Sequence, residues 1–190
     1  MQTNISKTNY LFDSIFEPTR NSTSTFLIND NKEISYMDFH IMINQLANVL
    51  IKKGMRAGDR VAVQAEKSNT QIALYAATIK AGGVYLPLNT GYTSSELDYF
   101  IKDSSAKIVI VDTHVENLIS KNLDANTVLL TLSSDETGSL TALADKQETF
   151  FDTVKRGPDD LAAILYTSGT TGKSKGAIPV SYTHLRAHET

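Results

Sequence analysis

Cysteine is absent from this sequence of 190 residues, and so is tryptophan. The absence of cysteine excludes disulfide bonds and thiolate metal sites, and it is compatible with a cytoplasmic protein. The sequence has no apolar run of about 18 residues, so it predicts no transmembrane helix. The first ten residues, MQTNISKTNY, lack the basic start and the apolar stretch of a secretory signal. We therefore expect a cytoplasmic protein.

An excess of one charge is also missing. The chain has 18 Lys and Arg residues against 21 Asp and Glu residues, for a net charge of −3, and the two signs are interspersed. This pattern argues against a nucleic-acid surface and against a basic patch that binds membranes. Hydrophobic residues make up 41 % of the chain, which is typical of a sequence that folds around a buried core.

Helical and strand-like segments alternate along the chain. Met42, Leu46, Val49 and Leu50 fall on one face of a helix, whereas residues 107–112, KIVIVD, are almost wholly apolar, as in a strand covered on both faces. The predicted helices are residues 36–53, residues 69–81, a segment that is capped by Ser94 or Ser95 and runs to about Asp103, and a weaker one near 138–146. The predicted strands are residues 60–65, 84–88, 107–112, 127–131 and 161–166. This alternation predicts an α/β fold of layered sheet and helices, without internal repeats.

The stretch with the clearest chemistry is Tyr166–Gly176, YTSGTTGKSKG. Its glycines allow a tight turn and a close approach to a ligand, and successive backbone N–H groups in such a turn can bind an anion. Hydroxyls add hydrogen-bond donors, and lysines add positive charge. The candidate phosphate-binding residues are Thr167, Ser168, Gly169, Thr170, Thr171, Gly172, Lys173 and Lys175.

Two common nucleotide motifs do not fit this stretch. A Walker loop requires G-x-x-x-x-G-K-S/T, and Thr167 stands where its first glycine belongs. The dinucleotide pattern G-x-G-x-x-G fails as well, because Thr171 stands two residues after Gly169. A phosphotransferase and a dinucleotide enzyme are therefore disfavoured. The remaining alternative from composition alone is a polar surface loop without a ligand.

The same stretch resembles the phosphate-binding signature of the adenylate-forming superfamily, which includes acyl-CoA synthetases, nonribosomal peptide adenylation domains and luciferases. The signature reads approximately S/T-S-G-S/T-T-G-x-P-K-G. The sequence matches it from Thr167 to Lys173 and at Lys175 and Gly176, and departs from it at Ser174, where most members have proline.

Residues 60–103 and 158–176 resemble malonyl-CoA synthetases more narrowly. The strings VAVQ-x-EKS, VYLPLNT and YT-x-x-ELDYFI-x-D are typical of that subgroup, and Ser174 matches its own departure from proline. Similarity in residues 60–103 identifies a relative and does not mark a site. We expect these large side chains to belong to the core: Tyr85, Leu86, Leu88, Leu97, Tyr99 and Phe100.

The resemblance implies a ligase that uses ATP, Mg²⁺ and CoA. A carboxylate, here malonate, would attack the α-phosphorus of ATP to give an acyl-adenylate and pyrophosphate, and CoA would then form the thioester and release AMP. Ser168, Thr170 and Thr171 would donate hydrogen bonds to the phosphates, the loop glycines would permit the turn, and Lys173 and Lys175 would offset charge. Catalytic residues and the adenine, metal and malonate sites are expected beyond this segment. Two alternatives stay open: another superfamily member, such as a fatty acyl-CoA synthetase or an amino-acid adenylation domain, and a non-catalytic nucleotide-binding module.

The last residues of the chain have a different character. Ser181–Thr190, SYTHLRAHET, can be encoded in full by TCT TAT ACA CAT CTC CGA GCC CAC GAG AC and any final base, which is the transposon end and adapter used to tag sequencing libraries. The same frame extends back through Val180 into the codon of Pro179. We therefore expect residues 179–190 to be adapter-derived and residues 1–178 to be a partial N-terminal AMP-binding domain. His184, Arg186 and His188 are accordingly not taken as a metal or catalytic cluster.

Overall fold

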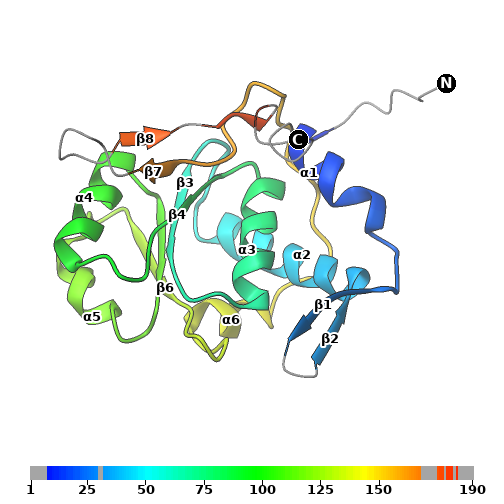
Figure 1. Cartoon of the computed structure of the whole chain (residues 1–190), viewed down its shortest axis with the longest axis horizontal. Coiled ribbons are helices and arrows are strands. Elements are labelled where there is room, and N and C mark those ends of the chain that lie inside the picture. Colours follow the sequence, from blue (N-terminus) through cyan, green and yellow to red (C-terminus); the bar gives the residue numbers. More distant parts are fainter. Residues whose placement is uncertain (1–7, 30–31, 168–174, 178, 182, 184–190) are drawn as a thin grey trace.

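A four-stranded parallel sheet forms the centre of the molecule (Figure 1). The computed structural model describes residues 8–29, 32–167, 175–177, 179–181 and 183. The strand order is β4–β3–β5–β6, formed by β3 (Arg60–Gln64), β4 (Val84–Pro87), β5 (Ile108–Val111) and β6 (Val128–Thr131). Every adjacent pair in this sheet is parallel. The predicted α/β class and these four predicted strands are confirmed.

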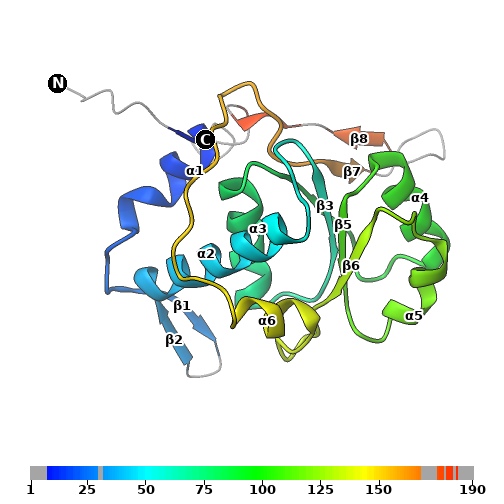
Figure 2. The same ribbon diagram turned by 180° about the vertical axis from the view of Figure 1, so that it is seen from behind.

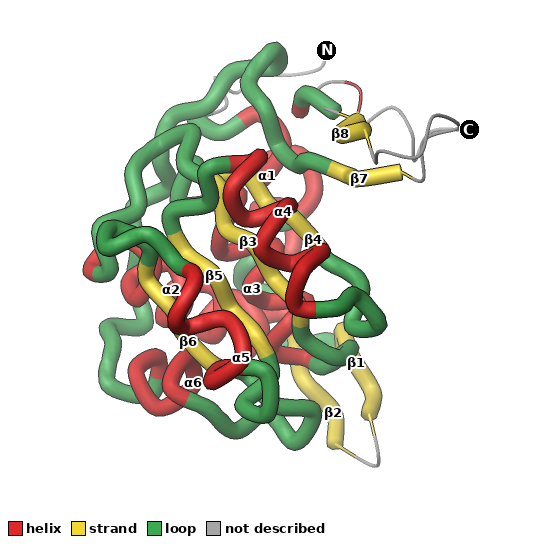
Figure 3. The backbone as a smooth tube through the Cα atoms, turned by 90° about the vertical axis from the view of Figure 1, so that its left-hand side faces the viewer, coloured by secondary structure: helices red, strands yellow, loops and turns green. Residues whose placement is uncertain are grey.

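Helices cover both faces of this sheet (Figures 2 and 3). The helices α2 (Tyr36–Lys52), α3 (Asn69–Lys80) and α6 (Ser139–Ala144) pack on one face, and α4 (Ser94–Ser104) and α5 (Glu116–Ile119) pack on the other. Alternate residues of β5 serve the two layers: Ile108 and Ile110 belong to the α2–α3 core, and Val109 and Val111 belong to the α4 core. This is the pattern expected of a parallel strand buried on both faces.

The start of α4 differs from the prediction. The cap is Thr93, whose Oγ1 accepts from the backbone N–H of Glu96 at 3.4 Å, while a Glu96 side-chain oxygen accepts from the Thr93 N–H at 2.8 Å. Ser94 and Ser95 are therefore inside the first turn. The reciprocal pair decides the boundary, because a capping box requires the acidic residue three positions after the cap.

The segment before α2 contains elements that the sequence patterns did not predict. These are α1 (Tyr10–Ile15), the 3₁₀ helix η1 (Glu17–Thr19), and the antiparallel strands β1 (Thr25–Asn29) and β2 (Lys32–Ser35). Asn9 joins this segment to the core, since its side-chain amide donates to the carbonyls of Ile79 at 2.8 Å and Val154 at 3.2 Å. The short helices α5 and η2 (Ser120–Asn122), between β5 and β6, were also not predicted.

An extended segment after α6 runs back along α2 (Figure 2). Asn48 of α2 donates through its side-chain amide to the carbonyls of Glu148 at 3.0 Å and Phe150 at 2.9 Å. Farther along, the N–H of Val154 donates to the carbonyl of Lys80 at 2.9 Å. These bonds satisfy backbone groups of a segment that has no regular secondary structure. The segment leads the chain to the edge of the sheet at β4, where residues 160 and onward follow.

The prediction of one continuous buried strand at residues 161–166 is wrong. Ala163 forms an isolated parallel bridge with Tyr85 of β4, and the chain then leaves the sheet and forms β7 (Leu165–Thr167). Leu165 is 43 % exposed. An apolar run fixes neither the partner of a strand nor its length, so the sequence could not show that pairing with β4 stops after one bridge.

Most of the predicted core residues are buried. Tyr85, Leu86, Leu88, Leu97 and Phe100 are each at most 6 % exposed. Tyr99 is 41 % exposed, so its assignment to the core was wrong. It lies on the outer face of α4, next to the buried Phe100 in sequence, and helix geometry turns adjacent residues by about 100°. In the described part of the chain, no helix combines the length and the apolarity needed to cross a bilayer.

Part of the segment predicted to be adapter-derived lies within the described residues. Leu161 forms an antiparallel bridge with Val180, and the N–H and hydroxyl of Ser181 both donate to the carbonyl of Asp160, at 2.9 and 3.0 Å. The acceptors are backbone carbonyls, and one of the donors is the side-chain hydroxyl of Ser181. These contacts do not test the origin of residues 179–190, which stays a prediction.

Candidate phosphate-binding site

The candidate phosphate loop is closed at its base by a β-hairpin. β7 pairs antiparallel with β8 (Lys175–Ala177), with Leu165 opposite Ala177, Tyr166 opposite Gly176, and Thr167 opposite Lys175. Thr167 and Lys175, the first and last of the predicted phosphate-binding residues, are thus cross-strand partners. The hairpin stands apart from the four-stranded sheet (Figure 3).

The other six candidate residues lie outside the described residues: Ser168, Gly169, Thr170, Thr171, Gly172 and Lys173. Their predicted roles stay predictions. The hairpin pairing is described only for the residues on either side of this segment, 165–167 and 175–177.

Tyr166 connects the hairpin to α4. Its hydroxyl donates to Oδ2 of Asp103 at 2.5 Å, and its ring lies 4.4 Å from that of Phe100 between centroids. Burial, followed by the hydrogen bond and the negative charge of Asp103, raises the pKa of Tyr166 above its ordinary value. The hydroxyl therefore keeps its proton at neutral pH and acts as the donor.

The sequence patterns did not single out this use of Asp103 and Phe100. They lie three residues apart on α4, so they share a face of the helix and can both meet Tyr166. A spacing of i and i+3 is too common to identify such a site. The contact joins residues 63 positions apart in sequence, and tertiary structure was needed to find it.

A small cavity of about 210 Å³ opens at the carboxyl edge of the sheet. It lies where the connections after β3 and β5 lead in opposite directions, the position at which open α/β sheets commonly bind ligands. Its lining residues are Gln64, Glu66, Thr90, Gly91, Asp112, His114 and Val115.

The lining of this carboxyl-edge cavity is rich in hydrogen-bond acceptors. The Gln64 amide nitrogen donates to the carbonyls of Asn89, Thr90 and Tyr92, which leaves Oε1 without a partner. Burial acts to raise the pKa of Asp112, but hydrogen bonds from the backbone and ring of His114 outweigh it and hold that pKa below its ordinary value. The cavity is thus better suited to donors than to phosphate.

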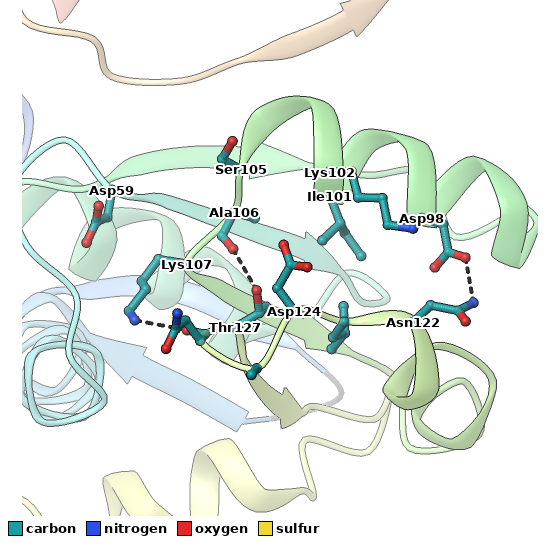
Figure 4. A pocket seen from close by; sticks show the side chains of 13 residues that line it. Asp59, Asp98, Ile101, Lys102, Ser105, Ala106, Lys107, Asn122, Asp124 and Thr127 are labelled. Carbon is teal, nitrogen blue, oxygen red and sulfur yellow. Dashed lines mark hydrogen bonds between the residues drawn. The ribbon is translucent and has the colours of Figure 1, made fainter.

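A larger groove of about 470 Å³ lies at the opposite, amino edge of the sheet, beneath α4 (Figure 4). Some of its polar groups bond to one another: Lys107 donates to the carbonyl of Asn126 at 2.9 Å, and Asn122 donates to Asp98 at 2.6 Å. Its lining contains no residue of β7 or β8. The groove therefore contributes nothing to the candidate phosphate site.

Comparison with known proteins identifies the family. The family model described as AMP-binding enzyme matches residues 17–187. The chain belongs to this family of adenylate-forming enzymes. It is 42 % identical to apo MatB from Rhodopseudomonas palustris, with a TM-score of 0.87 over 92 % of this chain and 35 % of that one. The ATP-bound structure of MatB gives 43 % identity and a TM-score of 0.85 over the same shares.

A second group of relatives consists of large synthases. Tyrocidine synthase 2 from Brevibacillus parabrevis is 33 % identical over 168 residues, which are 88 % of this chain and 4 % of that protein. The chain thus spans about a third of the length of MatB and a small part of the synthase.

Within the described ranges, no group of three or more His, Cys, Asp or Glu side chains is placed to hold a metal ion.

Proposed function

We propose that the full-length protein containing this chain is an ATP-dependent acid–CoA ligase that activates malonate. The carboxylate attacks the α-phosphorus of ATP, pyrophosphate leaves, and the thiol of CoA then displaces AMP from the acyl-adenylate. The observation that carries the proposal is the β7–β8 hairpin. In a chain of the AMP-binding family, it pairs Thr167 with Lys175 at the two ends of a loop made of hydroxyl, glycine and lysine residues.

The donor chemistry of the loop fits a polyphosphate. Ser168, Thr170 and Thr171 supply hydroxyl donors, and Lys173 and Lys175 supply positive charge. The residues within 167–175 include no carboxylate that would repel phosphate. Such donors stabilise charge that grows on the leaving pyrophosphate. Mg²⁺, when bound together with ATP, would neutralise further charge.

The choice of malonate has support from sequence similarity. Residues 60–103 and 158–176 resemble malonyl-CoA synthetases, including Ser174 at the position where most superfamily members have proline. The identity with MatB, 42 %, also exceeds the 33 % with tyrocidine synthase 2 and the 22 % with the anthranilate–CoA ligase AuaEII. We propose that residues 1–178 form the N-terminal part of the enzyme and that residues 179–190 come from an adapter.

The nearest alternative is an amino-acid adenylation domain, which the similarity to tyrocidine synthase 2 favours. The two enzymes differ in the charge that they must accept beside the reacting carboxylate. Malonate carries a second carboxylate and requires a cation, whereas an amino acid carries an ammonium and requires an acid. Residues that make this choice belong to the part of the enzyme outside this chain.

Acid-dependent exchange of pyrophosphate into ATP tests the proposal. The full-length enzyme from the parent locus is assayed with malonate, acetate, a long-chain fatty acid and a mixture of amino acids, and CoA thioesters are identified by mass. We expect the fastest exchange and a thioester with malonate. Exchange that depends on an amino acid would assign the protein to peptide synthesis, and ATP binding without exchange would indicate a non-catalytic module.

A further inference from the structure

The hairpin below the phosphate loop has few described attachments to the rest of the molecule. Upstream of it, the N–H of Ile164 donates to the carbonyl of Tyr85 at 3.0 Å, and the sheet contact ends there. Within the hairpin, β7 pairs with β8 and with neither β4 nor any other strand of the main sheet. The position of the hairpin over α4 must therefore depend on side chains.

Tyr166 supplies two different contacts at this place. Its ring packs against Phe100, which is 2 % exposed and part of the α4 core, and its hydroxyl reaches the exposed carboxylate of Asp103 at 2.5 Å. A tyrosine can hold an apolar surface with its ring and a polar partner with its hydroxyl at the same time. The two contacts together fix both the location and the rotation of the side chain.

The surface that receives Tyr166 is itself fixed at both ends. Thr93 and Glu96 cap the first turn of α4. At the other end, Nε and Nη2 of Arg60, the first residue of β3, donate to the carbonyls of Ser104 and Ser105 at 2.5 and 2.8 Å. Both ends of α4 are therefore held in place, and we call the surface formed by Phe100 and Asp103 the α4 platform. Asp103 directly precedes Ser104, the first of the two residues whose carbonyls Arg60 binds.

The register of the hairpin connects this platform to the loop. Tyr166 is opposite Gly176, and its next neighbour Thr167 is opposite Lys175. Any shift of Tyr166 therefore moves Thr167 and, through the pairing, Lys175. On the proposed function, these two residues frame the phosphates of ATP.

We propose that Tyr166, held by Asp103 and Phe100, is a positioning residue for adenylation: it places the phosphate loop from the side of α4 without touching the substrate. This inference rests on the proposed ligase function. A displacement of about 1 Å of a positioning element can cost about a hundredfold in rate. The loss should fall on the step that handles pyrophosphate, and thioester formation from a ready-made acyl-adenylate should change little.

The test measures the two half-reactions separately in the full-length enzyme. Tyr166→Phe keeps the ring on Phe100 and removes the hydroxyl, and Asp103→Ala removes its partner. We expect each to slow adenylation about tenfold to a hundredfold and to change thioester formation less than about twofold. The double variant should be no slower than either single variant, because both remove the same hydrogen bond.

Two further variants separate positioning from general stability. Asp103→Asn keeps an acceptor for the hydroxyl and should retain most of the adenylation rate. Tyr99→Phe removes an exposed hydroxyl from the same helix and should leave both half-reactions unchanged. Equal loss in both half-reactions, additive losses in the double variant, or full activity of Tyr166→Phe would overturn the positioning role.

The outcomes also distinguish this inference from the function on which it rests. If the wild-type enzyme shows no acid-dependent exchange, the ligase proposal fails and the positioning role fails with it. If the wild-type enzyme is active and Lys175→Ala slows adenylation while Tyr166→Phe does not, the function stands and the positioning role alone is wrong.

Discussion

The carbonyl oxygen of Thr131 occupies the space that a side chain on Gly138 would need. A Cβ on Gly138 would lie 2.2 Å from that oxygen. The two segments are held together by reciprocal bonds: the N–H of Thr131 donates to Oγ of Ser139, and the N–H of Ser139 donates to Oγ1 of Thr131, both at 2.9 Å. The end of β6 thus closes tightly on the start of α6.

Gly138→Ala should therefore destabilise the fold strongly. Gly138 has φ +149°, which is unfavourable for alanine, and the backbone of Thr131 cannot yield without breaking the reciprocal bonds. Strain and overpacking together predict a loss of at least about 2 kcal/mol in the free energy of unfolding. Gly58→Ala is the control: φ is +86° but the Cβ meets nothing within 4 Å, so only the conformational cost of about 1–2 kcal/mol remains. Equal losses in urea unfolding would contradict the steric argument.

Thr93→Ala should lower the free energy of unfolding by about 1 kcal/mol, because the first turn of α4 loses its cap. Ser95→Ala, two residues later on the exposed surface, should stay within about 0.5 kcal/mol of wild type. Thermal unfolding of both variants checks this. A larger loss of stability in Ser95→Ala than in Thr93→Ala would show that Ser95, as the sequence suggested, and not Thr93 caps the helix.

The charge of Glu96 should make the stability of α4 depend on pH. A hydrogen bond from the Thr93 backbone, followed by one from its hydroxyl, lowers the pKa of Glu96 in the folded state. A lowered pKa gives stability that is present above the unfolded pKa of about 4.3 and is lost as the pH falls through the folded value. The stability difference between wild type and Glu96→Gln should thus be largest above about pH 5 and shrink below about pH 4. A difference that grows toward low pH would reverse the sign that we assign.

Lys175→Ala in the full-length enzyme should slow adenylation more than it affects folding. Because Lys175 belongs to a polar, glycine-rich stretch of sequence, we expect the substitution to change the free energy of unfolding by at most about 0.5 kcal/mol. A charge-assisted hydrogen bond to the leaving pyrophosphate contributes about 1.5–3 kcal/mol, which is about tenfold to a hundredfold in rate. Separate assays of the two half-reactions, with the melting temperature as the control, measure this. An equal loss of rate in both half-reactions would show that Lys175 does not act at the phosphate site.

The origin of residues 179–190 can be checked at the DNA level. We expect the parent locus, amplified from genomic DNA without tagmentation, to encode after Ile178 a sequence unrelated to SYTHLRAHET. The reason is that all ten residues of Ser181–Thr190 match a translation of the adapter in one reading frame. Recovery of the same codons from such DNA would show that the segment is native.

Local patterns in the sequence were sufficient to predict the main helices and strands of the fold. The apolar face of α2 and the apolar run of β5 predicted a helix and a doubly covered strand, because periodicity records which faces are buried. The glycine, hydroxyl and lysine residues of 166–176 predicted an anion-binding loop and, by resemblance, a family that the comparisons confirm. In each case the information lies within a few adjacent residues.

Tertiary structure alone decided the relations between distant residues. It showed that pairing with β4 ends at Ala163, that Thr167 faces Lys175, and that Tyr166 reaches Asp103 across 63 positions of sequence. It also placed Tyr99 outside the core. No local pattern encodes such contacts, because they depend on how separately formed elements pack together and on which hydrogen-bond partners that packing leaves within reach.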